Sequence, residues 1–420
     1  MTDVDISTTT QTDPSSPPTT TTLPNGPDPS PASPSPGPTL KRAKTSPGVI
    51  READGAYAGT VHPMTWGHTF DTLPSQTLRA QAFALAAGVV RVFAQYESSS
   101  SSCSSYPCTT KSTLSGTGAV LAVLPVTGGS GQTGNDVEGM VDVYVVTNNH
   151  VVPSKSSGLR LKRISFTWGI YAPLARATPT SPLAAYPTCI KLSSHAKIVE
   201  YLGPESTDKD LDRAADLAFL RCSLPAFVAA AHLAPLTPHA ADSDGGGEDV
   251  GDDVVAVGYP GSRVSGYAYD ALFEAFHMTA AMGPSRPSPE PGVIAHAAPV
   301  KKGMSGMPLA FTSSPSSAFA GIHRGRIEGG DDDESESVPH LNAAIRVSAP
   351  TFACGFLRYV ANPIVSSSTT DYTVSSKAAF VSRLSSWVSS TRDSVDSCTK
   401  LFKTYAKSAA AIKAERSEDL

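Results

Sequence analysis

The sequence predicts an all-β protein with a disordered tail at its start and helices at its end, and three observations support this prediction. Short runs rich in β-branched and aromatic residues, bounded by turn residues, recur between residues 88 and 347. Residues 1–50 are mainly Thr, Ser, Pro and Asp, and too few are apolar to form a core. Residues 376–414 lack Gly and Pro and place apolar residues at roughly helical spacing. Strands joined by turns favour antiparallel sheets over alternating β-α-β units.

Composition excludes several functional classes. The chain has 420 residues, of which 40% are hydrophobic, which is enough to bury one sizeable core or two. A net charge of −5 without a long basic run argues against a dedicated nucleic-acid binder. No apolar stretch reaches the roughly 18 residues that a membrane helix needs. The first five residues form neither a basic nor an apolar signal region, so we expect a cytoplasmic or nuclear protein.

The cysteines do not form a recognisable framework. They lie at positions 103, 108, 189, 222, 354 and 398. Without a signal peptide, we expect them to be reduced. A bridge between Cys103 and Cys108 is the alternative if the chain is exported by another route.

The first half of the chain contains one short helix and a series of strands. We expect the helix at 81–85, a serine-rich loop at 98–113 and a glycine-rich hairpin tip at 126–140. The expected strands are 88–94, 116–124, 143–152, 160–167, 196–201 and one that begins at Asp216.

The second half predicts another sheet and then helices. A Pro-, Gly- and Asp-rich linker at 235–253 leads into short strands at 254–347, which fit six-stranded antiparallel closure. One or two helices should follow. The expected organisation is a disordered tail, a first sheet domain with its lead-in segment, a second sheet domain and a helical extension, at 1–50, 51–230, 231–350 and 351–420.

Three polar clusters each allow a sharper interpretation, which we weigh against a solvated surface. The basic run Lys41–Lys44 resembles a weak nuclear-localisation patch, but we favour solvated charges in a tail. His62 and His68 lack a Cys or carboxylate partner, which favours packing over a metal site. The acidic run 331–336 lacks the spaced ligands of a calcium loop. We therefore expect no metal and no cofactor.

A serine in a tight glycine-flanked loop is the leading candidate for chemistry. The loop reads G-M-S-G-M-P-L from Gly303 to Leu309. A serine hydroxyl is a poor nucleophile unless a base takes its proton and donors stabilise the oxyanion. Gly303 lets the backbone turn its N–H inward beside that of Ser305. A simple Gly/Ser turn is the alternative, and a base with an orienting carboxylate upstream would decide between them.

Both groups are present upstream. A β-branched strand ends in T-N-N-H at His150, where a histidine is rigidly placed at a turn. Asp216 directly precedes an apolar strand, where a part-buried carboxylate suits the orientation of an imidazole. Asp208, Asp210 and Asp212 compete for this role, but they lie in a charged stretch typical of a solvated turn. The chain order His, Asp, Ser is the one used by double β-barrel proteases.

Seven phrases in this order resemble those of trypsin-like serine peptidases, closest to the HtrA-type and glutamyl endopeptidase branches of the chymotrypsin fold. They are G-T-G-A-V-L at 116–121, T-N-N-H-V-V at 147–152, A-D-L-A-F-L at 215–220, V-V-A-V-G-Y-P at 254–260, G-M-S-G-M-P-L at 303–309, A-G-I-H-R-G at 320–325 and N-A-A-I-R-V at 342–347.

The resemblance implies two six-stranded antiparallel β-barrels and a serine endopeptidase acting on polypeptides. By position, it assigns His150 as base, Asp216 as its orienter and Ser305 as nucleophile. Gly303 and Ser305 would supply the oxyanion-hole amides. His323 matches a specificity-pocket histidine, which implies a preference for Glu or Gln before the scissile bond. Another preference, with His323 only packing, is the alternative.

This sequence also departs from the family pattern. Met304 stands where the family usually has Asn or Asp, and Met307 where it often has Gly, so Met307 would narrow the wall beside the nucleophile. Neither change removes a catalytic group. The peptide-binding PDZ domain of HtrA-type proteins has no counterpart in the short C-terminal tail. The alternative function is an inactive relative that binds peptides or proteins.

Overall fold

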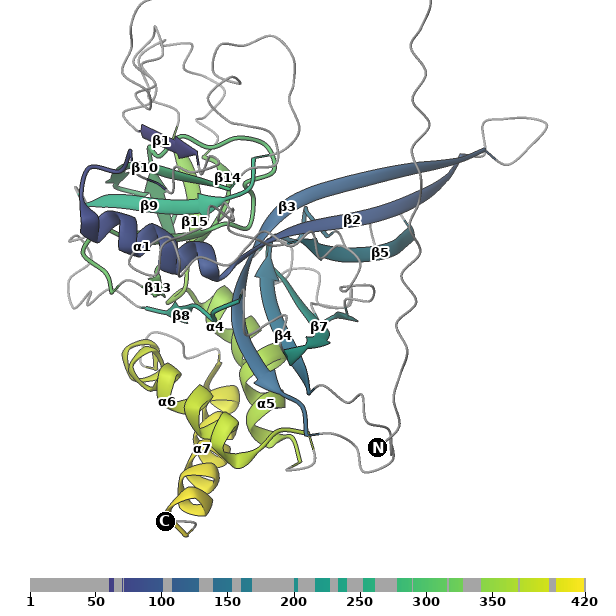
Figure 1. Cartoon of the computed structure of the whole chain (residues 1–420), viewed down its shortest axis with the longest axis vertical. Helices are drawn as coiled ribbons and strands as arrows, with labels where there is room; N and C mark the ends of the chain where they lie inside the picture. Colours follow the sequence, from purple (N-terminus) through teal and green to yellow (C-terminus); the bar gives the residue numbers. More distant parts are fainter. Residues whose placement is uncertain are drawn as a thin grey trace, which may run out of the picture. The chain divides into compact units, whose positions relative to one another are not determined.

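The computed structural model describes most of the strands and helices expected between residues 60 and 418. The described residues are 60–63, 70, 72–100, 108–127, 139–152, 160–167, 200–202, 216–226, 233–239, 252–260, 278–288, 290–315, 317–327, 341–368, 371–392 and 398–418. The N-terminal tail, His68, Cys103, Cys189, the three competing aspartates and the acidic run lie outside them. The described chain contains two antiparallel sheets, and helices follow them (Figure 1).

The first sheet contains six antiparallel strands in the order β5-β2-β3-β4-β7-β6. Their bounds are β2 Val89–Ser100, β3 Cys108–Pro125, β4 Met140–Thr147, β5 Arg160–Thr167, β6 Glu200–Tyr201 and β7 Ala218–Pro225. Strand β4 is buried on both faces. Val143 and Val145 lie in one core cluster, while Tyr144 and Val146 lie in another, as alternating strand side chains should.

The second sheet closes on itself. Its strands are β1 Thr60–Pro63, β9 Asp253–Gly258, β10 Thr279–Arg286, β11 Val293–His296, β12 Pro308–Phe311, β14 Gly321–Arg326 and β15 Asn342–Arg346. Because β9 pairs with both β12 and β10, six strands form a ring, and β1 is added beside β10. A separate parallel pair joins β8 Thr237–Pro238 to β13 Ala318–Phe319.

The expected fold class is confirmed, with one difference between the sheets. The second sheet is a closed six-stranded barrel carrying one extra strand, whereas the first is curled and, within the described residues, open between β5 and β6. The lead-in segment contacts the second sheet: β1 pairs with β10, and α1 Gln76–Ala87 donates from Gln81 Nε2 to the Phe311 carbonyl at 2.7 Å. Helix α1 is longer than predicted because Ser75 caps its first turn and Gly88 its last.

The predicted bounds of the serine-rich loop, 98–113, are wrong. Strands β2 and β3 continue as a paired hairpin to Ser100 opposite Cys108 (Figure 1). A ladder of backbone hydrogen bonds does not need apolar side chains, so the polar composition concealed these strands.

Helices cover residues 350–418 apart from short connections. They are α4 Pro350–Phe356, the π-helical turn η5 Leu357–Ala361, α5 Asn362–Ser366, α6 Val374–Thr391 and α7 Thr399–Glu418. The helices predicted within 376–414 are confirmed as α6 and α7. No helix in the described ranges is long and apolar enough to cross a membrane.

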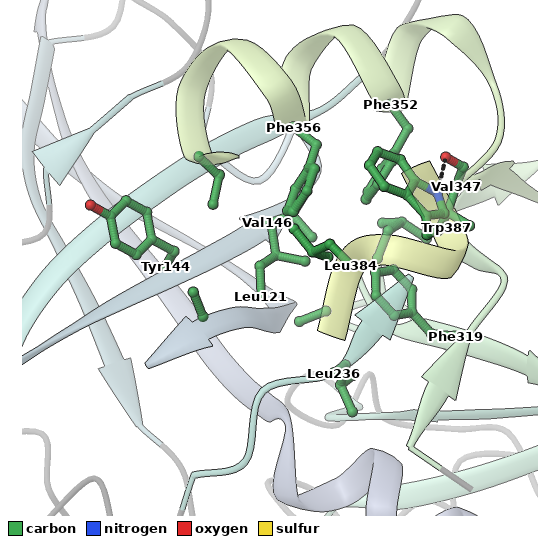
Figure 2. Packing of buried hydrophobic residues seen from close by; sticks show 14 of the residues in the cluster. Leu121, Tyr144, Val146, Leu236, Phe319, Val347, Phe352, Phe356, Leu384 and Trp387 are labelled. Atoms are coloured by element: carbon green, nitrogen blue, oxygen red, sulfur yellow. Dashed lines mark hydrogen bonds between the residues drawn. The ribbon is translucent and has the colours of Figure 1, made fainter. Parts of the chain in front are cut away.

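The largest core cluster joins these helices to the sheets. Phe352 of α4 stacks on Phe356 at 5.9 Å, and the Trp387 ring of α6 meets Phe356 edge-on at 5.1 Å (Figure 2). The Trp387 indole N–H donates to the Val347 carbonyl at 3.2 Å, which satisfies its one buried donor (Figure 2). Tyr144, Val146 and Leu121 of the first sheet belong to the same cluster.

The expectation of uniformly reduced cysteines is wrong. Cys354 of α4 and Cys398, directly before α7, form a disulfide. The pairing depends on two helices meeting in space, so the positions in sequence did not reveal it. Cys222 is a buried free thiol, and burial together with the nearby Asp142 carboxylate raises its pKa to about 12.

Candidate active site

His150 and Asp216 meet because their strands are paired. Strand β4 ends at Thr147, which lies opposite Ala218 at the start of β7, so residues beyond these ends are neighbours. The His150 Nδ1 atom lies 2.7 Å from Oδ2 of Asp216, and the His150 backbone N–H donates to Oδ1 at 3.0 Å. One carboxylate therefore fixes both the ring and the backbone of the histidine. The His150 side chain remains 48% exposed.

The backbone of Asp216 is itself held in an uncommon conformation. Its φ of 46° lies in the left-handed region, which aspartate tolerates better than most residues. The Asp216 carbonyl accepts from the Asn149 N–H at 3.1 Å and from Asn148 Nδ2 at 2.9 Å. Both asparagines of the T-N-N-H phrase thus help to place the carboxylate.

Ser305 lies in a loop with two left-handed glycines. Gly303 has φ 98° and Gly306 φ 88°. The N–H of Met304 donates to the Lys301 carbonyl at 3.0 Å, and the N–H of Gly306 to the His323 carbonyl at 2.8 Å. Within the described chain, the N–H groups of Gly303 and Ser305 donate to no protein acceptor. Two such amides on either side of one residue can bind a developing oxyanion.

The serine loop contacts the first sheet through its backbone. Thr117 of β3 donates its N–H to the Ser305 carbonyl at 2.7 Å, and Thr147 at the end of β4 donates its hydroxyl to the Thr117 carbonyl at 2.6 Å. Thr147 is three residues before His150, so the histidine turn and the serine loop meet at Thr117. Among the described residues, no hydrogen bond joins the Ser305 hydroxyl to the His150 ring. In proteases without substrate this bond is often long and tightens on binding.

The specificity candidate His323 is buried on β14 beside the serine loop. Its N–H donates to the Met307 carbonyl at 3.0 Å, and its Nδ1 lies 3.4 Å from Nε2 of His296 on β11. Burial, the neighbouring His296 and then His150 lower the pKa of His323 well below 6.5. Burial lowers the pKa of His296 to about 3, so both rings are neutral at pH 7. Arg324, the next residue, forms an ion pair with Glu290.

The two methionine departures lie inside the core of the second sheet. Met304 and Met307 are fully buried with Leu309, Phe311 and other apolar residues. The Met304 Sδ accepts from the Lys301 N–H at 3.4 Å. The Met307 side chain therefore packs in the core of the second sheet, and its expected narrowing of the wall beside Ser305 stays a prediction.

Three residues with direct contacts at this site were absent from the predicted set: Asn148, Thr117 and His296. The phrases T-N-N-H and G-T-G contained the first two, but their partners lie far away in sequence. His296 carries no motif. Among the described residues, no group of three or more His, Cys, Asp or Glu side chains is placed to hold a metal ion.

Comparison with known proteins finds one family model that matches the central part of the chain. Residues 129–311 match the family model of the trypsin-like peptidase domain. This match confirms the resemblance carried by the sequence phrases and supports the expectation of a serine endopeptidase. No curated protein matches the chain.

Several solved structures are similar to the chain at low sequence identity. An HtrA-type protease with a decapeptide is 16% identical, with coverage of 64% of this chain and 63% of that chain and a TM-score of 0.36. The serine endoprotease from Yersinia pestis is 15% identical, with coverage of 66% of this chain and 64% of that chain and a TM-score of 0.33. The inactive form of the Rv3671c protease from M. tuberculosis is 17% identical, with coverage of 69% of this chain and 96% of that chain and a TM-score of 0.34. The chain spans less than two thirds of the length of the first two.

Proposed function

Because residues 129–311 match the family model of the trypsin-like peptidase domain, we propose that this chain is a serine endopeptidase that uses Ser305, His150 and Asp216. The observation that carries the proposal is the doubly bonded His150–Asp216 pair, at 2.7 and 3.0 Å, on strand ends that also contact the serine loop. A carboxylate at Nδ1 leaves Nε2 of the same ring as the proton acceptor. This is the arrangement that a general base requires.

The reaction proceeds by two acyl transfers. Ser305 Oγ attacks the scissile carbonyl carbon while His150 Nε2 takes the hydroxyl proton, and Asp216 stabilises the imidazolium. The tetrahedral intermediate collapses, the C–N bond breaks, and the leaving amine takes the proton from His150. Water then attacks the acyl-enzyme and transfers its proton to His150. Release of the acid returns that proton to Ser305.

The oxyanion that forms in both steps needs donors that are already in place. The N–H groups of Gly303 and Ser305 are the candidates, since neither donates within the described protein. The left-handed φ of Gly303, 98°, is a backbone conformation that glycine adopts without strain.

His323 is the candidate for the preference before the scissile bond. A neutral imidazole can donate one N–H to the carboxylate of Glu or the amide oxygen of Gln. His323 is only 3% exposed, and its ring is held by Nε2 of His296 and by a backbone hydrogen bond at Ala343, so its orientation is fixed. Such a site discriminates more strongly than an apolar pocket does. We therefore propose cleavage after Glu or Gln.

The activity is tested with a fluorophosphonate probe, which reacts with an activated serine. The full chain should be labelled, and Ser305→Ala should lose the label. Ser313→Ala, which removes an exposed serine hydroxyl bonded to Asp252, should keep it. His150→Ala should also abolish labelling. A wild-type chain that is folded but resists the probe would favour the non-catalytic binding module instead.

The preference is tested with a library of peptides after the activity has been established. Cleavage products should be enriched in Glu or Gln at the residue before the cut. His323→Phe should lose that enrichment while Ser305 still reacts with the probe. Random residues at that position in the wild-type products would rule out the role of His323.

A further inference from the structure

The G-T-G phrase at 116–118 has no role in the mechanism above, yet its central residue bonds both to the serine loop and to Tyr259. Thr117 is fully buried on β3. Its hydroxyl donates to the Gly303 carbonyl at 3.0 Å and accepts from the Tyr259 N–H at 3.0 Å. Its own N–H donates to the Ser305 carbonyl at 2.7 Å. The carbonyls on both sides of Met304 are therefore held by one residue of the opposite sheet.

The hydroxyl fixes the orientation of the peptide group between Gly303 and Met304. The oxygen of that group accepts from Thr117, and its N–H donates to the Lys301 carbonyl at 3.0 Å. A peptide plane bonded at both ends cannot rotate without breaking a buried hydrogen bond. Gly303 would otherwise be the most freely rotating residue in the loop, since glycine allows both signs of φ.

The serine loop packs closely against strand β3. A Cβ added at Gly116 would lie 2.5 Å from Val151 and 3.1 Å from the Ser305 carbonyl. A Cβ at Gly306 would lie 2.0 Å from the Thr117 carbonyl. The loop and strand β3 thus touch backbone to backbone, which requires glycine on both sides of the contact.

We propose that Thr117 is a positioning residue that holds the Gly303 and Ser305 amides in the geometry that binds the oxyanion. The inference rests on the proposed peptidase function. Thr117 touches neither substrate nor reacting atoms, and it acts through the peptide groups that it bonds. Its hydroxyl is the essential part, because it is the only group in this contact that bonds Gly303 and Tyr259 together within the described residues.

The test compares Thr117→Val, which keeps the shape and removes the hydroxyl, with Thr117→Ser, which keeps the hydroxyl. Thr391→Val is the matched control: Thr391 is also buried and donates to the Trp387 carbonyl at 2.7 Å, but it lies in α6. For each full-length variant, the fluorophosphonate labelling rate is measured against probe concentration. This separates the maximal rate from the half-saturating concentration. The melting temperature is measured in parallel.

We expect Thr117→Val to lower the maximal labelling rate on the order of 100-fold, because a misplaced oxyanion donor weakens transition-state binding. The half-saturating concentration should change less than about twofold, since ground-state binding does not use these donors. Thr117→Ser should restore the rate to within about threefold of wild type, because the hydroxyl is kept. Thr391→Val should lose stability without losing rate.

Three results would overturn the inference while leaving the proposed function intact. These are a Thr117→Val rate equal to wild type, a Thr117→Ser rate as low as that of Thr117→Val, and a Thr117→Val chain that does not fold. The last would show that the hydroxyl serves folding alone. A wild-type chain without labelling at Ser305 is a different failure, because it removes the proposed function and the inference together.

Discussion

The two sheets hold the candidate site residues in different ways. On the first sheet, His150 and Asp216 lie at paired strand ends and bond directly to each other. On the second, the loop that carries Ser305 receives its restraints from residues elsewhere, namely His323 on β14 and Thr117 on the first sheet. The proposed base and its carboxylate are a local unit, whereas the proposed nucleophile is placed by a contact between sheets.

This difference predicts different consequences of mutation. A change within the His150–Asp216 pair should alter the chemistry and leave the rest of the molecule folded. A change at the contact between Thr117 and the serine loop should affect stability and activity together, because close backbone packing and oxyanion geometry share the same atoms. The following experiments test that division, starting with the largest effect.

Asp216→Asn should reduce the maximal labelling rate about 10⁴-fold, because an amide stabilises neither the imidazolium nor the correct tautomer. Asparagine adopts the left-handed φ of 46° as readily as aspartate, so the backbone should be preserved. The labelling rate and the melting temperature are measured together. Asp371→Asn, at an exposed carboxylate that accepts from Ser368, is the control and should leave both unchanged. A folded Asp216→Asn chain with more than a tenth of wild-type activity would contradict the pair's role.

Gly306→Ala should lower both stability and activity. The new Cβ would meet the Thr117 carbonyl at 2.0 Å, and φ of 88° is strained for any residue with a Cβ. We expect the free energy of unfolding to fall by about 3 kcal/mol and labelling to fall on the order of 100-fold. Urea unfolding and probe kinetics measure the two effects.

Gly139→Ala provides the matched control for that experiment. A Cβ at Gly139 would meet only Ala226 at 3.9 Å, which is ordinary contact. This variant should behave as wild type in both assays. If Gly306→Ala lost activity without any loss of stability, the loop would be independent of the contact between sheets, and the comparison above would fail.

The sequence predicted the strands better than it predicted their ends and closures. Strand β5 lies at 160–167 as expected, and in its second half the buried Ile164 and Phe166 flank the more exposed Ser165. The extent of the β2–β3 hairpin was underestimated, since its Ser- and Thr-rich end is paired by a backbone ladder that needs no apolar side chains. The disulfide between Cys354 and Cys398 depends on how α4 and α7 pack, which no local pattern encodes.

In the candidate site too, some contacts could be predicted from the sequence and others could not. The approach of His150 to Asp216 follows from strands that end side by side, so sequence patterns could anticipate it. The bonds from the Thr117 hydroxyl span 142 and 186 residues, and a buried threonine in a strand gives no local sign of such partners. His296 beside His323 was missed for the same reason.

The buried imidazoles of the second sheet should make stability depend on pH. The pKa of His296 is lowered to about 3 by burial, while the unfolded chain takes up this proton near 6.5. The buried, neutral His296 therefore makes its full contribution to the free energy of unfolding above pH 6.5. This contribution is lost progressively as the pH falls toward 3. Between pH 6.5 and 5, unfolding should become easier by up to about 2 kcal/mol from this residue.

Urea unfolding of wild type and His296→Phe at several pH values measures that contribution. For the variant, the slope of the free energy of unfolding against pH should be smaller by about 1.4 kcal/mol per pH unit between pH 6.5 and 5, which corresponds to one proton. Equal slopes for wild type and His296→Phe would show that His296 already takes up its proton in the folded state.

The smallest effect concerns the attachment of the C-terminal helices to the first sheet. Tyr372, between α5 and α6, donates its hydroxyl to Asp142 of β4 at 2.6 Å, and Ser223 of β7 donates to the same carboxylate. Tyr372→Phe removes one of these donors and should lower the free energy of unfolding by about 1.5 kcal/mol. Labelling of Ser305 should not change, because the network lies on strands β4 and β7 away from their His150 and Asp216 ends. A loss of labelling in a stable Tyr372→Phe chain would show instead that the helices control the site through β4, and His150 would then be no more local than Ser305.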